Sequence, residues 1–175
     1  MTTSENAVTI REFRPGDETA FRLLNEEWIM RYFGSLEPPD IATLTNPRGK
    51  ILDPGGRILF ATQGDQLIGC CALLAIAPRE FEVAKMTVKE SFRRGGIGRQ
   101  LLETAIAQAR GMGARRLYLE TNGKLANAIR LYESVGFRHL PPERIVPSAY
   151  TRANVYMELF LQPSPASSRS RFSKA

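Results

Sequence analysis

The stretch VKESFRRGGIGR, residues 88–99, decides the fold. A strand-like run ends at Val88, a polar spacer follows, and glycines lead straight into a helical pattern. Glycine lets the backbone approach a ligand closely, and the first N–H groups of a helix have no internal partner. These N–H groups also lie at the positive end of the helix dipole. The stretch therefore predicts a cradle for phosphate oxygens, with positive charge added by Arg93, Arg94 and Arg99.

Other phosphate-binding loops fit this stretch less well. The P-loop pattern G-x-x-x-x-G-K-[ST] does not occur in the chain. The dinucleotide-binding pattern G-x-G-x-x-G begins at Gly96 and Gly98, and Glu120 follows at a suitable distance, but Leu101 replaces the third glycine. That pattern also turns directly from strand to helix, whereas residues 89–95 intervene here. A turn with no ligand is a further alternative, and the three converging arginines weigh against it.

Hydrophobic periodicity divides the rest of the chain into strands and helices. The expected elements are a strand at 8–13, a helix from 17, a short helix with loops within 36–56, strands at 57–63, 66–76 and 80–88, a helix at 99–110, a strand at 116–121, a helix at 124–135 and a strand at 150–161. The order β-α-α-β-β-β-α-β-α-β predicts one α/β domain of the α+β type over residues 1–162, with a mixed sheet flanked by helices.

Composition limits the classes of protein. The chain has 175 residues, 43% of them hydrophobic and 24% charged, which suits a single domain with a sizeable core. The apolar run Leu67–Ala77 is about half of the ~20 residues of a membrane helix, so no membrane partner is expected. The net charge is +6, and Arg169, Arg171 and Lys174 supply half of it within residues 163–175, an expected flexible Ser/Pro/Arg-rich tail. Nucleic-acid binding is therefore not the expected main function.

The cysteines indicate a reducing compartment. Cys70 and Cys71 are neighbours in an apolar strand, where they are too constrained to bridge each other. With no signal-peptide pattern at the N-terminus, we expect reduced core residues in a cytoplasmic protein. The single histidine, His139, adds no metal-site spacing, and no metal site is predicted.

Residues 93–98 also match a family signature. They read RRGGIG and fit the pattern [QR]-x-x-G-x-[GA] of the GNAT superfamily of acetyl-CoA-dependent N-acetyltransferases. The strand at 81–88 resembles the family's fourth strand, and AIRLYESVGF at 128–137 resembles its second conserved segment. The two signatures occur in the right order with a helix and a strand between them, and the resemblance covers residues 8–161.

The resemblance implies that acetyl-CoA binds in a slot where the fourth and fifth strands part. The pantetheine arm would pair with the fourth strand, and the pyrophosphate would lie on the N–H groups of the glycine loop. In the common pattern N-x-x-A-x-x-L-Y an asparagine contacts the arm, but here Leu125 stands at that position, between Asn122 and Asn127. The implied cofactor-binding residues are Met86, Thr87, Val88, Arg93, Arg94, Gly95, Gly96, Ile97, Gly98, Arg99, Asn122 and Asn127.

Acetyl transfer to an amine needs a base and an acid but no enzyme nucleophile, because the thioester is already activated. Glu82 is the expected general base, since burial in a mostly apolar strand raises a carboxyl pKa. Its structural alternative is a salt bridge with Lys85 or an arginine. Tyr132 is the expected general acid, since a phenol stays protonated at neutral pH and the family's tyrosine at this place meets the sulfur. Its alternative is a core tyrosine.

The strand at 80–88 carries two further expectations. Regular alternation places Glu82, Ala84, Met86 and Val88 on one face, unless a bulge reverses it. By resemblance, a backbone N–H near Met86 or Thr87 donates to the carbonyl oxygen as negative charge develops there.

The acceptor pocket is expected between the first two helices and the last strands. Trp28, Tyr32, Glu37 and Arg152 are the candidate lining residues, and an arginine there favours an acidic substrate. The predicted function is transfer of an acetyl group from acetyl-CoA to a primary amine of a small molecule or peptide, by direct attack in a ternary complex. The alternative is a non-catalytic acyl-CoA-binding or regulatory module on the same fold. The oligomeric state, including a homodimer, stays open.

Overall fold

The computed structural model describes residues 6–162. Its strands and helices, in chain order, are β1 Val8–Glu12, α1 Glu18–Phe33, α2 Pro38–Thr45, β2 Arg57–Gln63, β3 Gln66–Ala77, β4 Glu80–Val88, α3 Ile97–Gly111, β5 Arg116–Thr121, α4 Ala126–Ser134, β6 Arg138–His139 and β7 Val155–Phe160. Single turns of other helix types lie at Arg48–Leu52, Glu90–Phe92 and Pro142–Arg144.

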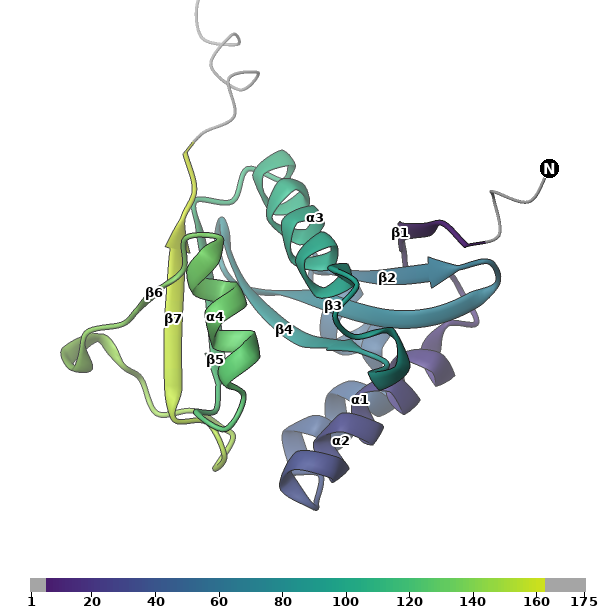
Figure 1. Cartoon of the computed structure of the whole chain (residues 1–175). Helices are drawn as coiled ribbons and strands as arrows, with labels where there is room; N and C mark the ends of the chain where they lie inside the picture. The colour runs from purple at the N-terminus through teal and green to yellow at the C-terminus, as the bar shows by residue number, and fades with distance from the viewer. Residues whose placement is uncertain (1–5, 163–175) are drawn as a thin grey trace, which may run out of the picture.

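The strands form one mixed sheet in the order β1-β2-β3-β4-β5-β7-β6 (Figure 1). All neighbours are antiparallel except β4 and β5, which are parallel. This parallel pair holds for only three residue pairs, Glu80 with Arg116, Phe81 with Leu117 and Glu82 with Tyr118. Beyond them the two strands diverge, as Figure 1 shows, so a gap opens within the sheet between the ends of β4 and β5.

Each face of the sheet carries its own hydrophobic core. On one face, α3 and α4 pack on the larger cluster, because the apolar residues of α3 recur at helical spacing, among them Leu101, Ala105 and Ala109. On the other face, α1 and α2 bury Phe21, Ile29 and residues of β2 and β3. In Figure 1, α3 lies above the sheet and α1 and α2 lie below it.

A β-bulge interrupts β4 at Lys85. Two steps along β3, from Ala72 to Cys70, match three steps along β4, from Ala84 to Thr87. Lys85 takes up the extra residue with a φ of +52°, a backbone conformation that non-glycine residues seldom adopt. The bulge reverses which side chains face each core beyond Lys85.

The expected fold class and element order are confirmed, with two differences in detail. The two-residue strand β6 is additional, since so short a segment carries no periodic signal. The last strand begins at Val155 rather than residue 150, because the preceding residues form turns with hydrogen bonds to other loops. The expected tail at 163–175 lies outside the described residues. Across residues 6–162, the model has no helix that combines the length and the apolar character needed to span a bilayer.

We predict that Gly56→Ala destabilises the fold while Gly111→Ala does not. A Cβ on Gly56 would lie 2.2 Å from the carbonyl oxygen of Leu73 and 2.5 Å from that of Ile51, and neither backbone atom has room to move. The expected cost is about 2 kcal/mol or more, measured by urea unfolding. At Gly111, in the last turn of α3, an added Cβ meets nothing within 4 Å, so this control should be neutral or slightly stabilising.

Candidate active site

A cleft of about 450 Å³ occupies the gap between β4 and β5. Its walls come from the second halves of both strands, the end of α1, the start of α4, the glycine loop and the segment before β7. The cleft lies where the sheet opens, and side chains reach it from both faces. Two ligands approaching from opposite faces of the sheet can therefore meet in it.

The glycine loop presents a row of unpaired backbone donors. The N–H groups of residues 94–99 donate no hydrogen bond to any part of the chain that the structure describes. Arg94 and Gly96 have φ values of +73° and +76°, which turn the chain into α3, and the buried side chain of Ile97 anchors the first turn. This is the arrangement that binds the oxygens of a phosphate or diphosphate.

Two of the three expected arginines hold neighbouring elements together. The Arg93 Nε donates to the carbonyl oxygen of Val88 (3.1 Å), and its Nη1 donates to the Tyr32 hydroxyl on α1 (3.1 Å). Arg99 donates to Ser134 Oγ at the end of α4 (2.8 Å). Both remain beside the loop and add positive charge there, but their side chains also join the loop to α1 and α4.

Tyr132 enters the cleft from the face of α3 and α4. Its ring is buried in the larger core cluster and meets Phe137 edge to face, with ring centroids 5.9 Å apart. The hydroxyl makes no hydrogen bond within the described residues, although the residue lines the cleft. Burial raises the pKa of Tyr132 well above its usual range, so its hydroxyl stays protonated.

Glu82 enters the cleft from the opposite face. It pairs across the sheet with Leu74, which packs on the α1 and α2 cluster, so Glu82 points to that side. Burial raises the pKa of Glu82 to about 7, the negative charge of Glu120 adds to this, and Lys85 opposes it. Glu82 has no salt bridge among the described residues, so the expected alternative of an ion pair with Lys85 is wrong: Lys85 binds Asp40 instead.

Regular alternation along β4 ends at Lys85, because the bulge that the sequence left open as an alternative occurs there. Met86 and Val88 pack on the α3 side, the opposite face from Glu82. The extra residue at Lys85 causes this reversal. The bulge thereby places Met86 and Val88 on the opposite face of the strand from Glu82, whereas Thr87, which pairs with Cys70, stays on the Glu82 face.

A second carboxylate in the cleft, Glu120, was not among the expected site residues. It accepts hydrogen bonds from the Tyr118 hydroxyl (3.0 Å) and from Ser148. The alternation of β5 carries the signal, because Leu117 and Leu119 point into the larger core and Tyr118 and Glu120 therefore point to the face of Glu82.

A buried ionic cluster forms one wall of the cleft. Asp40, from α2, is fully buried and binds both the Lys85 Nζ (2.6 Å) and the Arg152 guanidinium (2.6 and 2.8 Å). Glu37 also pairs with Arg152 (3.3 Å), and the Tyr150 hydroxyl lies 3.2 Å from the Lys85 Nζ. Burial alone would raise the pKa of Asp40, but the hydrogen bonds and charges of the two cations hold it at about 2.

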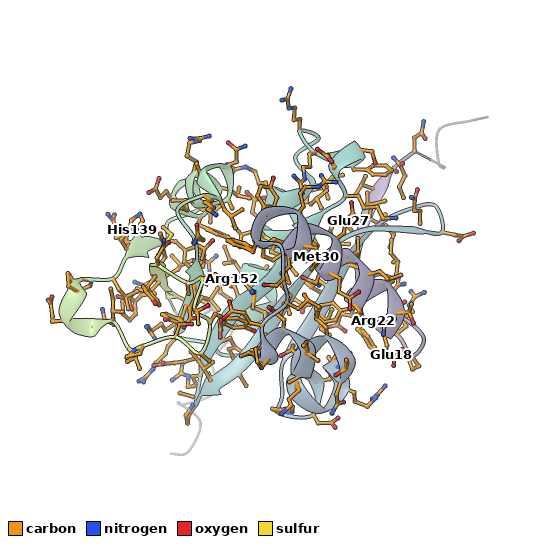
Figure 2. The ribbon with its side chains drawn as sticks, turned by 90° about the horizontal axis from the view of Figure 1, so that it is seen from below. Glu18, Arg22, Glu27, Met30, His139 and Arg152 are labelled. Atoms are coloured by element: carbon orange, nitrogen blue, oxygen red, sulfur yellow. The ribbon has the colours of Figure 1, made fainter. Side chains whose placement is uncertain are left out.

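The cluster joins α2, β4 and the segment before β7. In Figure 2 Arg152 lies between the half that contains His139 and the half that contains α1 with Met30 and Glu27. Glu37 and Arg152, which were expected to line the pocket for the acceptor amine, thus both bind other side chains of the protein. The expectation that Arg152 selects an acidic substrate stays a prediction, and the pairing of Arg152 with the carboxylates of Glu37 and Asp40 weighs against it.

Comparisons with known proteins agree on the family. The model of the acetyltransferase (GNAT) family matches residues 20–137. This chain belongs to the GNAT family. The IAA acetyltransferase of Azospirillum brasilense is 33% identical over 136 residues, which cover 77% of this chain and 87% of that protein. The uncharacterized N-acetyltransferase YvbK of Bacillus subtilis is 33% identical over 57% of this chain, and the match spans 66% of its own length.

Solved GNAT structures have the same fold. A GNAT-family acetyltransferase from Staphylococcus aureus superposes with a TM-score of 0.79 at 21% identity, over 89% of this chain and all of the other. The yncA protein of Salmonella typhimurium, solved with acetyl-CoA, superposes with a TM-score of 0.71 at 19% identity, over 91% of this chain and 96% of the other. At these identities the likeness concerns the fold.

The remaining GNAT-implied residues lie around the cleft in different roles. Asn122 lines it, but its side chain donates to the Arg152 carbonyl oxygen (2.6 Å) and accepts from the Lys124 N–H (2.8 Å), so it holds the loop together. Asn127 is exposed, lines the cleft and accepts from Arg130. Leu125, at the GNAT asparagine position, lines the cleft with an apolar surface.

Two aromatic residues of α1 also reach the cleft as expected. Trp28 lines it while its Nε1 donates to the buried Asn25 (3.2 Å), which fixes the indole. Tyr32 lines it near the glycine loop and accepts from Arg93. Both are suitably placed to form apolar walls.

We predict that Asp40→Asn strongly destabilises the protein. The change leaves Lys85 and Arg152 without their shared carboxylate, and breaking a buried ion pair on one side costs about 3–5 kcal/mol. The Asp40 contribution is present above pH 3.8, its ordinary pKa, and is lost as the pH falls toward 2. Urea unfolding at neutral pH should therefore show the full effect, and the difference from wild type should shrink in acid.

The matched control is Glu26→Gln, which removes a surface pair with Arg22 on α1. Such exposed pairs contribute about 0.5 kcal/mol or less. A similar loss from both variants would contradict the structural weight given to the Asp40 cluster.

Proposed function

We propose that this chain transfers the acetyl group of acetyl-CoA to a primary amine of a small molecule or peptide, by direct attack in a ternary complex. The observation that carries the proposal is the placement of Glu82 and Tyr132 on opposite faces of the sheet, in one cleft where β4 and β5 part. Glu82 is the proposed general base and Tyr132 the proposed general acid.

The chain's own groups suit coenzyme A on the α3 side. The unpaired N–H groups of residues 94–99 match a diphosphate, and Arg93 and Arg99 add charge beside them. Beyond Glu82 the β5-facing edge of β4 has no strand partner, so backbone groups near Met86 can pair with an amide-bearing arm, whereas the Val88 carbonyl oxygen already accepts from Arg93. Apolar side chains of α4, including Leu125 and Leu131, cover the other side.

Bound acetyl-CoA would supply an activated thioester carbonyl. Glu82 takes a proton from the incoming ammonium or amine, directly or through a water. Its pKa of about 7 makes it mostly ionised at slightly alkaline pH yet basic enough to accept the proton. A base with the ordinary carboxyl pKa of 4.5 would be a much weaker proton acceptor.

Tyr132 holds its proton until the thiolate departs. Its hydroxyl has no competing protein acceptor among the described residues, so it is free to donate toward the sulfur side of the cleft. The backbone at the bulge, near Met86 and Thr87, is the proposed donor to the carbonyl oxygen. A preorganised N–H in a water-poor cleft stabilises developing negative charge.

We predict that the protein releases free thiol from acetyl-CoA when a primary amine is supplied, and that Tyr132→Phe lowers kcat by about 100-fold. Phenylalanine keeps the buried ring and its packing on Phe137, so calorimetry should show nearly unchanged affinity for CoA. The measurements are a thiol-release assay over a panel of amines and titration with CoA.

Two results would contradict the proposal in different ways. CoA binding without thiol release from any amine would favour the alternative, a non-catalytic acyl-CoA-binding module. No heat with CoA would mean that the glycine loop does not hold the cofactor.

We predict that kcat/KM rises with pH through an apparent pKa near 7 and that Glu82→Gln abolishes this limb. Glutamine preserves the shape of the side chain, so CoA affinity should persist while the rate falls about 100-fold.

Stability gives an independent check on Glu82→Gln. The folded-state pKa of Glu82 lies above its ordinary value of 4.5, so its contribution to stability is present below pH 4.5 and is lost as the pH rises through 7. The variant should therefore be more stable than wild type at pH 8, on the order of 1–3 kcal/mol. An inactive variant that is also less stable at pH 8 would point to a packing defect instead.

A further inference from the structure

On the α1 and α2 side of the cleft, which we call the acceptor side because coenzyme A is proposed to bind on the α3 side, two carboxylates have no cationic partner. Within the described residues, no lysine, arginine or histidine nitrogen lies within 4 Å of the carboxylate of Glu82 or of Glu120. Glu120 receives only the neutral hydroxyls of Tyr118 and Ser148. The two carboxylates lie close enough for the charge of Glu120 to act on Glu82, and both line the cleft. A pair of half-buried anions of this kind favours a cation between or beside them.

The cations of the neighbouring wall pair with other carboxylates, and the charge of Lys85 only partly offsets the rise in the Glu82 pKa. Lys85 and Arg152 also line the cleft, but Asp40 and Glu37 bind them and match their two positive charges with two negative ones. The wall formed by these four residues is thus neutral. The excess charge of the acceptor side comes from the Glu82 and Glu120 carboxylates.

Two other cations border the cleft. Lys124 is exposed and lies over the Phe33 ring, 5.8 Å from its centroid, where water and salt screen its charge. Arg93 lies at the glycine loop, on the side expected to hold the phosphates, and donates to Tyr32 and Val88. Neither pairs with Glu82 or Glu120.

Aromatic rings complete a surface suited to a cation. Trp28, Phe33 and Tyr150 line the same cleft, and ring faces attract ammonium groups. Phe33 and Tyr150 already hold cationic side chains, with the Arg152 guanidinium carbon 5.4 and 4.7 Å from their centroids. The walls therefore tolerate positive charge, whereas a carboxylate brought beside Glu82 and Glu120 would meet like charge.

We propose that the acceptor is a basic amine with a second cationic group and no nearby carboxylate, and that Glu120 is the residue that selects it by binding the second charge. This inference rests on the proposed acetyl transfer and adds the substrate class. Glu82 then takes the proton of the reacting amine while Glu120 binds the second cation. If the acceptor had a carboxylate where its second cationic group is proposed to bind, this carboxylate would face that of Glu120 in a half-buried site.

The test compares three acceptors of equal length: a four-carbon terminal diamine, butylamine, and the four-carbon amino acid with its amine at the opposite end from its carboxylate. We expect kcat/KM for the diamine to exceed that for butylamine by roughly tenfold, and the amino acid to fall below butylamine by a similar factor. The preference should weaken at high salt, because charge–charge interactions are screened.

The decisive variant is Glu120→Gln, assayed at pH 8.5 so that Glu82 is ionised in both proteins. In this variant the ratio of kcat/KM for the diamine to kcat/KM for butylamine should fall toward one. The Glu120→Asp variant should retain most of the preference for the diamine. Glu143→Gln is the matched control, since it removes the same charge from an exposed residue outside the cleft. A purely structural role for Glu120 would lower the rates for all three acceptors together and leave their ratio unchanged.

The outcomes separate the two proposals. Thiol release that is fastest with the amino acid, or a ratio that Glu120→Gln leaves unchanged, would overturn the substrate class and leave acetyl transfer standing. Absence of thiol release with every amine, despite CoA binding, would overturn both.

Discussion

The ion pair between Asp40 and Lys85 holds the centre of this molecule in place. It joins residues 45 positions apart in the chain, at 2.6 Å and almost wholly away from solvent. Lys85 lies at the bulge of β4 with a positive φ, a conformation that costs on the order of 1 kcal/mol or more. The buried contact with Asp40 fixes its side chain toward α2, and Arg152 brings the segment before β7 to the same carboxylate. Strand, helix and loop are thereby set around one buried anion.

The bulge and the short parallel pairing together separate two chemical environments. Before the bulge, Glu82 faces the α1 and α2 side, where it lies opposite Leu74 and near Glu120, and burial raises its pKa. Beyond the bulge, Met86 and Val88 face the α3 side, where Tyr132 is enclosed by the larger core. In the proposed reaction Glu82 takes up a proton and Tyr132 gives one up, so the two side chains must reach the reacting atoms from different sides. Because β4 and β5 part after a short parallel pairing, Glu82 and Tyr132 reach a single cleft from opposite faces of the sheet.

The features of the fold that depend on neighbouring residues in the sequence could be predicted from it. The strands and long helices follow from periodicity, and the glycine loop follows from glycines placed before a helix. The bulge at Lys85 was not predictable in the same way, because a lysine within a strand ordinarily indicates a solvent-facing position. Its partner Asp40 lies in another element, and Arg152 lies 112 residues beyond Asp40, so no spacing rule joins them. Strand alternation could have predicted the orientation of Glu120. Leu117 and Leu119 of β5 face the larger core, so Glu120 faces the opposite side of the sheet.

The neutral wall and the two unpaired carboxylates are informative because they differ so sharply within one cleft. The buried acid Asp40 and its neighbour Glu37 are both matched by cations, as folding stability requires. Glu82 and Glu120 are not, and the pKa of about 7 at Glu82 arises first from its burial and then from the neighbouring charge of Glu120. Lys85 and Arg152 line the same cleft and could have neutralised Glu82 and Glu120, but both cations bind Asp40 instead. Retaining a costly pair of anions at the point where the sheet opens is what a site for a positively charged ligand requires, because the ligand itself then supplies the missing charge.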